Sequence, residues 1–572
     1  MGGKDIKVAD RTPIEGMAHV RGPSAPPLLE LTIPELLAGT AAEHGHREAA
    51  IFHAEGVRWT YAEFARRVDR LAGGLLRLGV RKGDRVGIWS PNNSAWLLTQ
   101  FATARIGAIL VCVNPAYRPY ELEYALNKVG CSTLITAPRF KTSDYVAMLN
   151  ELAPELATSE PGELSAAGLP ELKRVVAIGG TTPAGMFGFD AVCGMGDDTA
   201  QADLDQIGAG IRNTDPINIQ FTSGTTGRPK GACLSHRNIV NNAANVTSTL
   251  GLGADDRLCI PVPFYHCFGM VMGTLGCVTK GAAMVVPGEG FDPEETLATI
   301  SAERCTALYG VPTMFVAELG VPDLDRYDLS HLRTGIMAGA SCPIEVMKQV
   351  QSKMNMEQVT IAYGMTETSP VSFQSDTDDA IDKRVSTVGR IHPHVECKVI
   401  DADGRTVQPG VQGELLTRGY SVMQGYWDDD DRTAEVLIDG WMHTGDLATI
   451  DAEGYCRITG RVKDMILRGG ENVYPSEVEA FLYTHPDIAQ AQVFGIPDPH
   501  LGELVCAWVV PRAGAMLSEE DVGAFCRQSI AHFKVPAHVR IKDTLPMTVT
   551  GKPQKFIMRQ QMVEELEPAD PG

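Results

Sequence analysis

Residues 221–231 limit the possible folds and functions of this chain more than any other segment, and their sequence is FTSGTTGRPKG. The alternating residues Ile217–Phe221 predict a short strand that ends at a turn with four hydroxyl groups, and Lys230 follows the turn. Backbone N–H groups, hydroxyls and one ammonium clustered in this way suit a polyphosphate. The Gly-Lys-Ser/Thr step of the common P-loop does not occur at the required spacing, which indicates another type of phosphate loop. A plain Gly/Thr turn is the alternative, which the length of the run disfavours.

This run resembles the phosphate loop of the adenylate-forming superfamily, which comprises acyl-CoA synthetases, peptide-synthetase adenylation domains and luciferases. The resemblance extends from about residue 30 to residue 565, with the motifs in the family's order. It implies that Lys230 and the loop bind ATP. The loop residues that it implies as ATP contacts are Thr222, Ser223, Gly224, Thr225, Thr226 and Gly227.

Length and composition narrow the class of protein. A chain of 572 residues is too long for one core and predicts several lobes. A net charge of −21 disfavours nucleic-acid binding, although small polyanions need only a locally basic site. Thirteen dispersed cysteines without a CxxC pair predict reduced thiols in a cytoplasm. The most apolar window, Phe268–Val286, is interrupted by glycines and Lys280, so we expect a soluble, cytoplasmic protein without a membrane-spanning segment.

Strand and helix patterns alternate through most of the chain. Thr60–Glu63 is a capping box that opens a predicted helix, and Arg85–Trp89 and Thr133–Thr136 are predicted strands. Further strands are predicted after the phosphate loop, with helices between them. Such alternation predicts a largely parallel sheet covered by helices, with ligands beyond the C-terminal ends of the strands.

Two changes of pattern divide the last third of the chain. From about Val395, short strands and tight turns predict a small β-rich subdomain. Beyond Lys463, the segments predict a compact α+β unit of ordinary domain size. The predicted fold class is therefore α/β, with a large N-terminal domain of layered sheets plus a β-rich subdomain (residues 1–462) and a small mobile α+β C-terminal domain (residues 463–572).

The segment YGMTET, residues 363–368, follows the apolar run Val359–Ala362. The resemblance implies that Tyr363 stacks on adenine, Thr366 contacts phosphate and Glu367 binds Mg²⁺. One carboxylate with phosphate oxygens and waters is a normal set of ligands for Mg²⁺. A strand-to-loop turn with a solvated glutamate is the alternative.

Three more segments complete the implied nucleotide site. Gly339 and Ala340 belong to a small-residue segment that resembles the wall of the adenine and acyl pockets, because small residues let a flat ring approach the backbone. Asp446, in WMHTGD, is an acceptor-only carboxylate that can hold two ribose hydroxyls. Arg461 opens the longest matching motif and is implied as a nucleotide contact.

The C-terminal motifs concern domain movement and catalysis. Lys463 falls at the family's hinge position, and Arg468, Gly469 and Gly470 resemble the loop that lines the pantetheine tunnel for CoA. Lys552, in TGK, is implied as the cation that bridges the acyl oxygen and the α-phosphate, and with Glu367 and Thr222 it is predicted to be catalytic. The chain departs from the family at Pro553, where isoleucine is common, and Lys555 is considered as a stand-in lysine.

The acyl pocket is implied around the segment PFYHCFG, residues 263–269. His266 is expected near the carboxylate, with Phe268, Val271 and Gly339 as pocket wall. An isolated histidine among apolar residues is more often a hydrogen-bonded core residue, which is the alternative.

The predicted function is that of a fatty acyl-CoA synthetase. Its predicted cofactors are ATP and Mg²⁺, and CoA is its predicted co-substrate. Residues 418–427 and 529–536 look most like medium- and long-chain acyl members of the family. An aryl or short functionalised acid is the alternative substrate, because each of these acids needs an apolar pocket. A luciferase-like oxygenase, a peptide-synthetase domain and an inactive nucleotide-binding protein remain as alternative functions. A homodimer is a family-level expectation.

Overall fold

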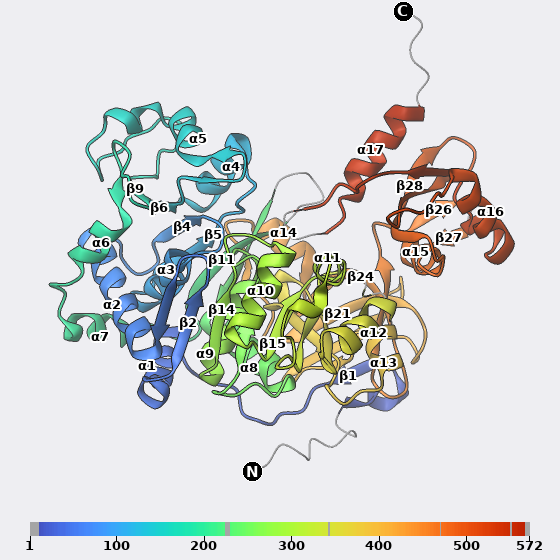
Figure 1. The fold of residues 1–572 in the computed structure, drawn as a ribbon, viewed down its shortest axis with the longest axis horizontal. Helices are drawn as coiled ribbons and strands as arrows, with labels where there is room; N and C mark the ends of the chain where they lie inside the picture. Colours follow the sequence, from blue (N-terminus) through green and yellow to red (C-terminus); the bar gives the residue numbers. More distant parts are fainter. Residues whose placement is uncertain are drawn as a thin grey trace, which may run out of the picture.

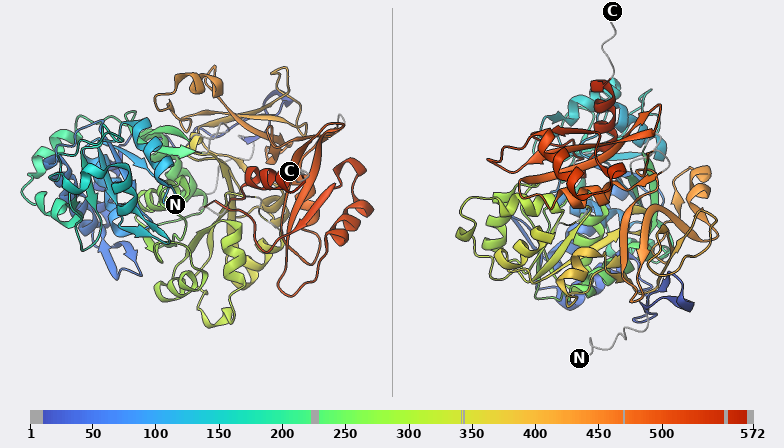
Figure 2. Two further views of the ribbon diagram at one scale, coloured as in Figure 1. Left: turned by 90° about the horizontal axis from the view of Figure 1, so that it is seen from above. Right: turned by 90° about the vertical axis from the view of Figure 1, so that its right-hand side faces the viewer.

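The computed structural model describes residues 11–222, 229–340, 342, 344–468, 471–548 and 552–566. The chain forms a large N-terminal part and a smaller C-terminal part, drawn in red at one end of the molecule in Figures 1 and 2. The predicted α/β fold class is confirmed. None of the helices in these ranges is long and apolar enough to cross a lipid bilayer.

The first sheet carries the flanks of the phosphate loop. It is parallel from β10 to β11 and antiparallel at β12 and β22. The predicted strands Arg85–Trp89 and Thr133–Thr136 are confirmed residue for residue as β4 and β6. Among the described residues the order across the sheet is β10 (Phe187–Gly188), β9 (Arg174–Ala177), β6, β4, β5 (Ile109–Cys112), β11 (Pro216–Thr222), β12 (Lys230–Ser235) and β22 (Gly425–Tyr426).

The second sheet has a parallel centre and antiparallel edges. Its strand β13 ends at Cys259, two residues before Pro261, which cannot donate to a ladder hydrogen bond. The order in the described part is β19 (Arg390–Ile391), β18 (Val371–Gln374), β17 (Gln358–Gly364), β16 (Thr334–Ala338), β15 (Ala307–Gly310), β13 (Arg257–Cys259), β14 (Ala283–Val286), β2 (Glu48–Phe52) and β3 (Val57–Thr60).

The largest apolar core joins one face of each sheet. Successive strand residues point to opposite faces, so Leu110 of β5 enters this core while Ile109 and Val111 enter a second core on the other face. The capping box predicted at Thr60 and Glu63 is present at the start of α2. The helices that share the central core are α1 (Ile33–His44), α2 (Tyr61–Arg77), α3 (Ser94–Arg105), α6 (Phe189–Met195), α7 (Gln201–Gly208), α8 (His236–Thr249), the π-helix η4 (Phe268–Leu275) and α9 (Gly276–Lys280).

Other helices cover the outer faces of the two sheets. Those on the first sheet are α4 (Pro119–Val129) and α5 (Tyr145–Leu152), beside the hairpin of β7 (Arg139–Phe140) and β8 (Ser143–Asp144). Those on the second sheet are α10 (Pro293–Glu303), α11 (Pro312–Leu319) and α12 (Ile344–Lys353). Shorter helical segments elsewhere are η2 (Ile14–Gly16), η3 (Pro154–Thr158), η5 (Leu324–Arg326), η6 (Thr366–Thr368), α13 (Ile381–Ser386) and α14 (Asp430–Val436).

The predicted β-rich subdomain is an antiparallel sheet with its own small core. Its strands are β1 (His19–Arg21), β20 (Val395–Ile400), β21 (Gly413–Gly419), β23 (Leu437–Ile438), β24 (Trp441–Ile450) and β25 (Cys456–Arg461).

The C-terminal part, which we call the lid, contains two apolar clusters formed by residues from Ile466 onward. Lys463 lies in the connection before it, and the exact boundary at this residue stays a prediction. The lid elements are β26 (Ile466–Arg468), β27 (Glu471–Val473), α15 (Pro475–Leu482), β28 (Ile488–Asp498), β29 (Gly502–Pro511), α16 (Glu519–Ser529), η7 (His532–Lys534), β30 (His538–Ile541) and α17 (Lys555–Leu566).

Candidate active site

The two flanks of the phosphate loop lie at the C-terminal end of the parallel strands. Thr222 is the last residue of β11 and Lys230 the first of β12, and the two residues face each other in the antiparallel pair. The loop therefore leaves the sheet at the edge predicted for a ligand site. The predicted contacts Ser223, Gly224, Thr225, Thr226 and Gly227 lie outside the described residues.

Glu367 lies against these flanks. The short 3-10 helix η6 places Glu367 directly after β17, and Glu367 is only 5% exposed. Thr222 Oγ1 donates a hydrogen bond to Glu367 Oε1 at 3.3 Å, and the Tyr426 hydroxyl donates to the same oxygen at 2.8 Å. Lys230 Nζ donates to the Tyr426 hydroxyl at 2.8 Å. The structure thus brings the predicted Thr222, Lys230 and Glu367 together, and adds Tyr426, which was not predicted as a site residue.

Asp446 is held by two of the other predicted residues. Tyr363 donates its hydroxyl to Asp446 Oδ2 at 2.5 Å, and Arg461 Nε donates to Asp446 Oδ1 at 3.1 Å. Asp446 and Arg461 are direct partners across β24 and β25, which explains the second contact. Burial raises the pKa of the Tyr363 hydroxyl well above its usual value, and the Asp446 carboxylate adds to this. The residue predicted to bind ribose, Asp446, and the residue predicted to stack on adenine, Tyr363, are therefore in contact.

Lys552 reaches the same region from the lid. Its backbone is fixed by Thr548, whose N–H donates to the Lys552 carbonyl at 2.8 Å and whose hydroxyl accepts from the Lys552 N–H at 3.0 Å. The lysine stem passes over Gly339, where a Cβ would lie 3.7 Å from Lys552 Cε. A lid residue and a residue of the N-terminal part are therefore in contact at the site.

The electrostatic surroundings of Lys552 confirm its position. Burial lowers the pKa of its ammonium, and the charge of Arg461 adds to this shift. The carboxylates of Asp446 and Glu367 act in the opposite direction. Charges act on the ammonium from nearby, so the lid lysine lies near the residues predicted to bind nucleotide and Mg²⁺.

Gly339 follows β16 with a φ of +93°, which only glycine adopts without strain. A Cβ there would also lie 3.3 Å from Val311 Cγ1. The positive φ and the close Val311 side chain therefore favour glycine here, while the neighbouring Ala340 is exposed.

Two of the predicted acyl-pocket residues, His266 and Gly339, lie near Lys552. Burial lowers the pKa of His266 to about 3, and the Lys552 ammonium adds to this effect, so the imidazole is neutral near pH 7. His266 Nδ1 accepts a hydrogen bond from the Phe268 N–H at 3.2 Å. Phe268 packs 5.4 Å from the Tyr309 ring, and Val271 is buried in η4. Their role in binding an acyl chain stays a prediction.

Comparison with known proteins decides the family. The model of the AMP-binding enzyme family matches residues 37–427, and that of the AMP-binding enzyme C-terminal domain matches residues 477–552. The chain belongs to this family. The predicted resemblance to the adenylate-forming superfamily is thereby confirmed.

Similarity to known acyl-CoA synthetases and ligases shows that this AMP-binding enzyme is an acid–thiol ligase. YngI of Bacillus subtilis (strain 168), named as a candidate acyl-CoA synthetase, is 47% identical over 539 residues, or 94% of this chain and 98% of YngI. The mitochondrial medium-chain acyl-CoA ligase ACSF2 of Danio rerio is 44% identical over 553 residues, or 96% of this chain and 91% of ACSF2. The solved structure of the anthranilate CoA ligase AuaEII with anthranoyl-AMP has a TM-score of 0.82 at 25% identity, covering 94% and 99% of the two chains. This chain is an AMP-forming acyl-CoA synthetase.

One arginine and one lysine of the synthetase, Arg468 and Lys555, lie apart from the rest of the predicted site. Arg468 Nη1 donates to the carbonyls of His532, Phe533 and Val535, all within the lid, so it is not brought to the site in this lid orientation. Its predicted neighbours Gly469 and Gly470 lie outside the described residues. Lys555 Nζ forms an ion pair with Glu479 Oε1 at 2.7 Å within the lid, so this possible stand-in is not brought to the site in this lid orientation.

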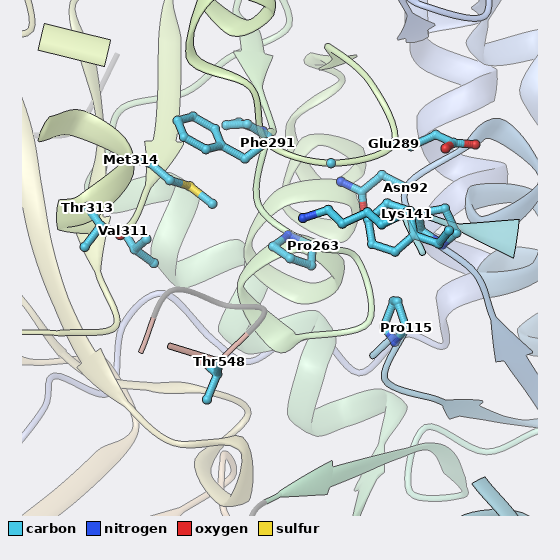
Figure 3. A pocket seen from close by; sticks show the side chains of 14 residues that line it. Asn92, Pro115, Lys141, Pro263, Glu289, Phe291, Val311, Thr313, Met314 and Thr548 are labelled. Carbon is cyan, nitrogen blue, oxygen red and sulfur yellow. The ribbon is translucent and has the colours of Figure 1, made fainter. Parts of the chain in front are cut away.

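A cavity of about 290 Å³ opens beside Thr548 of the lid (Figure 3). The lid contributes Thr548 and the N-terminal part contributes Val311, the residue that lies closest to a Cβ on Gly339. Lys141 runs across it in Figure 3. The residues that line it are Pro91, Asn92, Pro115, Phe140, Lys141, Pro261, Pro263, Glu289, Gly290, Phe291, Val311, Thr313, Met314 and Thr548.

The sequence carried a signal for this cavity that the motif analysis missed. Pro91, Pro115 and Pro261 each follow closely on the end of a parallel strand, namely β4, β5 and β13. β4 and β5 are neighbours in the first sheet and β13 belongs to the second, and ligands bind beyond the C-terminal ends of parallel strands. The motif residues alone did not point to them.

Proposed function

We propose that this synthetase activates a medium- or long-chain fatty acid with ATP and transfers the acyl group to CoA. The observation that carries the proposal is the position of Lys552, which comes from the lid and lies among Glu367, Asp446 and His266. A cation at that point meets the charge that develops when an acid oxygen attacks a phosphate. The two half-reactions follow from this arrangement.

In the first half-reaction, a carboxylate oxygen of the acid attacks the α-phosphorus of ATP. An oxygen–phosphorus bond forms, the bond to pyrophosphate breaks, and an acyl-adenylate remains. Lys552 stabilises the charge on the acid oxygen and the α-phosphate, and Lys230 stabilises the departing phosphates. The neutral His266 lies beside Lys552 and adds no second charge, so the carboxylate meets a single ammonium there.

Glu367 is the residue that would hold Mg²⁺. Its Oε1 accepts from Thr222 and Tyr426, whereas no hydrogen bond from the described residues reaches Oε2. The described residues hold no cluster of three acidic, histidine or cysteine side chains, so one carboxylate with phosphate oxygens and water is the fitting ligand set. Bound Mg²⁺ would neutralise charge on the phosphate oxygens.

In the second half-reaction, the thiol of CoA attacks the acyl carbon, a thioester forms and AMP leaves with the bonding electron pair. We propose that the cavity beside Thr548 is the route for the thiol arm, because it has apolar and polar walls and is lined by Val311, which lies next to Gly339. Rotation of the lid about Lys463 would withdraw Lys552 and bring Arg468, Gly469 and Gly470 to this route. A moving lid lets one site carry two reactions.

The identity of the acid is the finer part of the proposal. ACSF2, a medium-chain acyl-CoA ligase by name, shares 44% identity with this chain, whereas the anthranilate ligase AuaEII shares 25%. The larger identity supports an aliphatic acid. An aryl acid is the second candidate, because the AuaEII fold superposes well.

The test is a screen of AMP release over saturated acids of increasing length, with benzoates, cinnamates and thioether acids included. We expect a maximum at a medium or long aliphatic chain. A maximum on an aryl acid would replace the fatty-acid assignment and leave the mechanism in place. No AMP release with any acid would overturn the mechanism.

We also propose a reducing, cytoplasmic location, supported by thirteen cysteines that are all free. The homodimer expected from the resemblance stays a prediction, which light scattering of the purified protein would check.

A further inference from the structure

Tyr426 joins the two sheets at the nucleotide site. It lies on β22, directly opposite Ala232 of β12, and Lys230 lies two residues before Ala232 on the same face of that strand. Residues in this diagonal relation are within reach of long side chains. The other partner, Glu367, comes from the end of β17 in the second sheet. The tyrosine therefore stands between a cation and a carboxylate that belong to different sheets.

The direction of both hydrogen bonds is fixed by chemistry. A carboxylate only accepts, so the Tyr426 hydroxyl donates its one proton to Glu367 Oε1 at 2.8 Å. An ammonium only donates, so the same hydroxyl accepts from Lys230 Nζ at 2.8 Å. The Lys230 ammonium also lies 4.3 Å from the centre of the Tyr426 ring. Tyr426 is only 4% exposed, so water does not replace these contacts.

We propose that Tyr426 is a positioning residue that keeps Lys230 and Glu367 apart before magnesium and ATP bind. This inference rests on the proposed function of the site. Opposite charges at this range attract strongly where water is excluded. Without the hydroxyl between them, Lys230 and Glu367 would close into a direct ion pair. That pair would occupy the phosphate-binding ammonium and the metal-binding carboxylate at the same time.

The hydroxyl can be removed without removing the contacts that hold Tyr426 in the fold. Its backbone N–H donates to Thr433 Oγ1 at 2.9 Å, and the strand pairing with β12 does not involve the side chain. Tyr426→Phe therefore tests the hydroxyl alone. Tyr420→Phe is the matched control, because Tyr420 is buried six residues earlier and its hydroxyl accepts from Asn245, away from Glu367 and Lys230.

The first experiment measures binding of ATP with magnesium by calorimetry, in the absence of any acid. We expect Tyr426→Phe to weaken binding about ten-fold, the size of one lost polar contact. Tyr420→Phe should bind like the wild type, and both variants should keep a cooperative thermal transition. Wild-type protein that binds no nucleotide would overturn the proposed function, whereas equal binding by Tyr426→Phe and wild type would overturn only the present inference.

A double-mutant cycle distinguishes two roles of the Tyr426 hydroxyl: keeping Lys230 apart from Glu367, or contacting the nucleotide directly. Lys230→Gln removes the cation, so no ion pair can form and Tyr426→Phe should then cost less than about two-fold in binding. Losses that multiply in the double variant would overturn the spacing role. The second half-reaction, measured with supplied acyl-adenylate and CoA, should stay within about two-fold of wild type in Tyr426→Phe, since it needs no β- or γ-phosphate. An equal loss in both half-reactions would also overturn it.

Discussion

The two lysines of the site are held in opposite ways. Lys230 begins a strand of the large N-terminal part, and its ammonium is bonded to Tyr426. Among the described residues, Lys552 forms hydrogen bonds through its backbone to Thr548, and its ammonium forms none. Lys230 is thus held in place by a neighbouring side chain, whereas Lys552 is brought to the site by the lid.

This difference indicates that Lys230 and Lys552 have separate roles in binding and in catalysis. A group that contacts the phosphates of bound ATP as well as the departing phosphates contributes to ground-state binding, which appears in KM. A group that the lid places at the reacting oxygens contributes mainly where charge develops, which appears in kcat. We therefore expect substitutions of Lys230 and Lys552 to separate these two kinetic constants.

The largest effect is expected from Lys552→Ala. Adenylate formation, measured by acid-dependent ATP–pyrophosphate exchange, should fall about 10²- to 10³-fold, as for loss of one transition-state contact. CoA transfer from supplied acyl-adenylate should stay nearly intact, because the lid withdraws Lys552 for that step.

Lys555→Gln is the control for this variant, because Lys555 pairs with Glu479 within the lid. It should leave both half-reactions close to wild type. If Lys552→Ala reduced both half-reactions equally, the lysine would not be specific to the first, and the comparison with Lys230 would fail.

The next effect is expected from Lys230→Gln. Loss of a charged contact to the phosphates should raise KM for ATP about ten- to a hundred-fold, with a smaller change in kcat. Steady-state kinetics at saturating acid and varied ATP measures this. A fall in kcat at unchanged KM would mean that Lys230 acts like Lys552.

The pH profile distinguishes the two lysines further. Burial lowers the pKa of both ammonium groups below the ordinary 10.5, and each acts as a cation, so activity should decline on the alkaline side before that pH. We assign the decline in kcat/KM to Lys552, and expect Lys552→Arg to move it to higher pH because a guanidinium stays charged. A decline that keeps its position in Lys552→Arg would assign it to Lys230.

The smallest effect is expected from Lys141→Ala, outside both lysine sites. Lys141 lines the cavity proposed for the thiol arm, so its loss should raise KM for CoA about two- to five-fold and leave ATP–pyrophosphate exchange unchanged. Lys173→Ala is the control, since Lys173 contacts Pro170 and does not line the cavity. A change in exchange rate would place Lys141 in the first half-reaction instead.

Local signals explain what could be predicted from the sequence. The capping box at Thr60 and the strands Arg85–Trp89 and Thr133–Thr136 rest on neighbouring residues, and each was found where expected. Thr222 and Glu367 were found together, and each lies at the C-terminal end of a strand that has a parallel neighbour, β11 and β17. Asp446 lies within the antiparallel strand β24, so only the family resemblance pointed to it.

Contacts between distant segments explain what could not be predicted. Tyr426 is 196 residues from Lys230 in sequence, and only the pairing of β22 with β12 brings them together. The strands β9 and β10 were missed because they are short and lie among acidic and glycine-rich residues without a clear period. Lys555 was considered for the site because its distance from Lys552 is short in sequence, yet α17 turns it toward Glu479.

The burial of the Lys552 ammonium has a practical consequence for studying this enzyme. An amine must meet the solvent in its neutral form to react with an acylating reagent, and burial prevents this. Contact with Gly339 shelters it in the lid orientation described here. The rate at which this single amine takes up a chemical label would therefore report how often the lid turns away, with no substrate consumed.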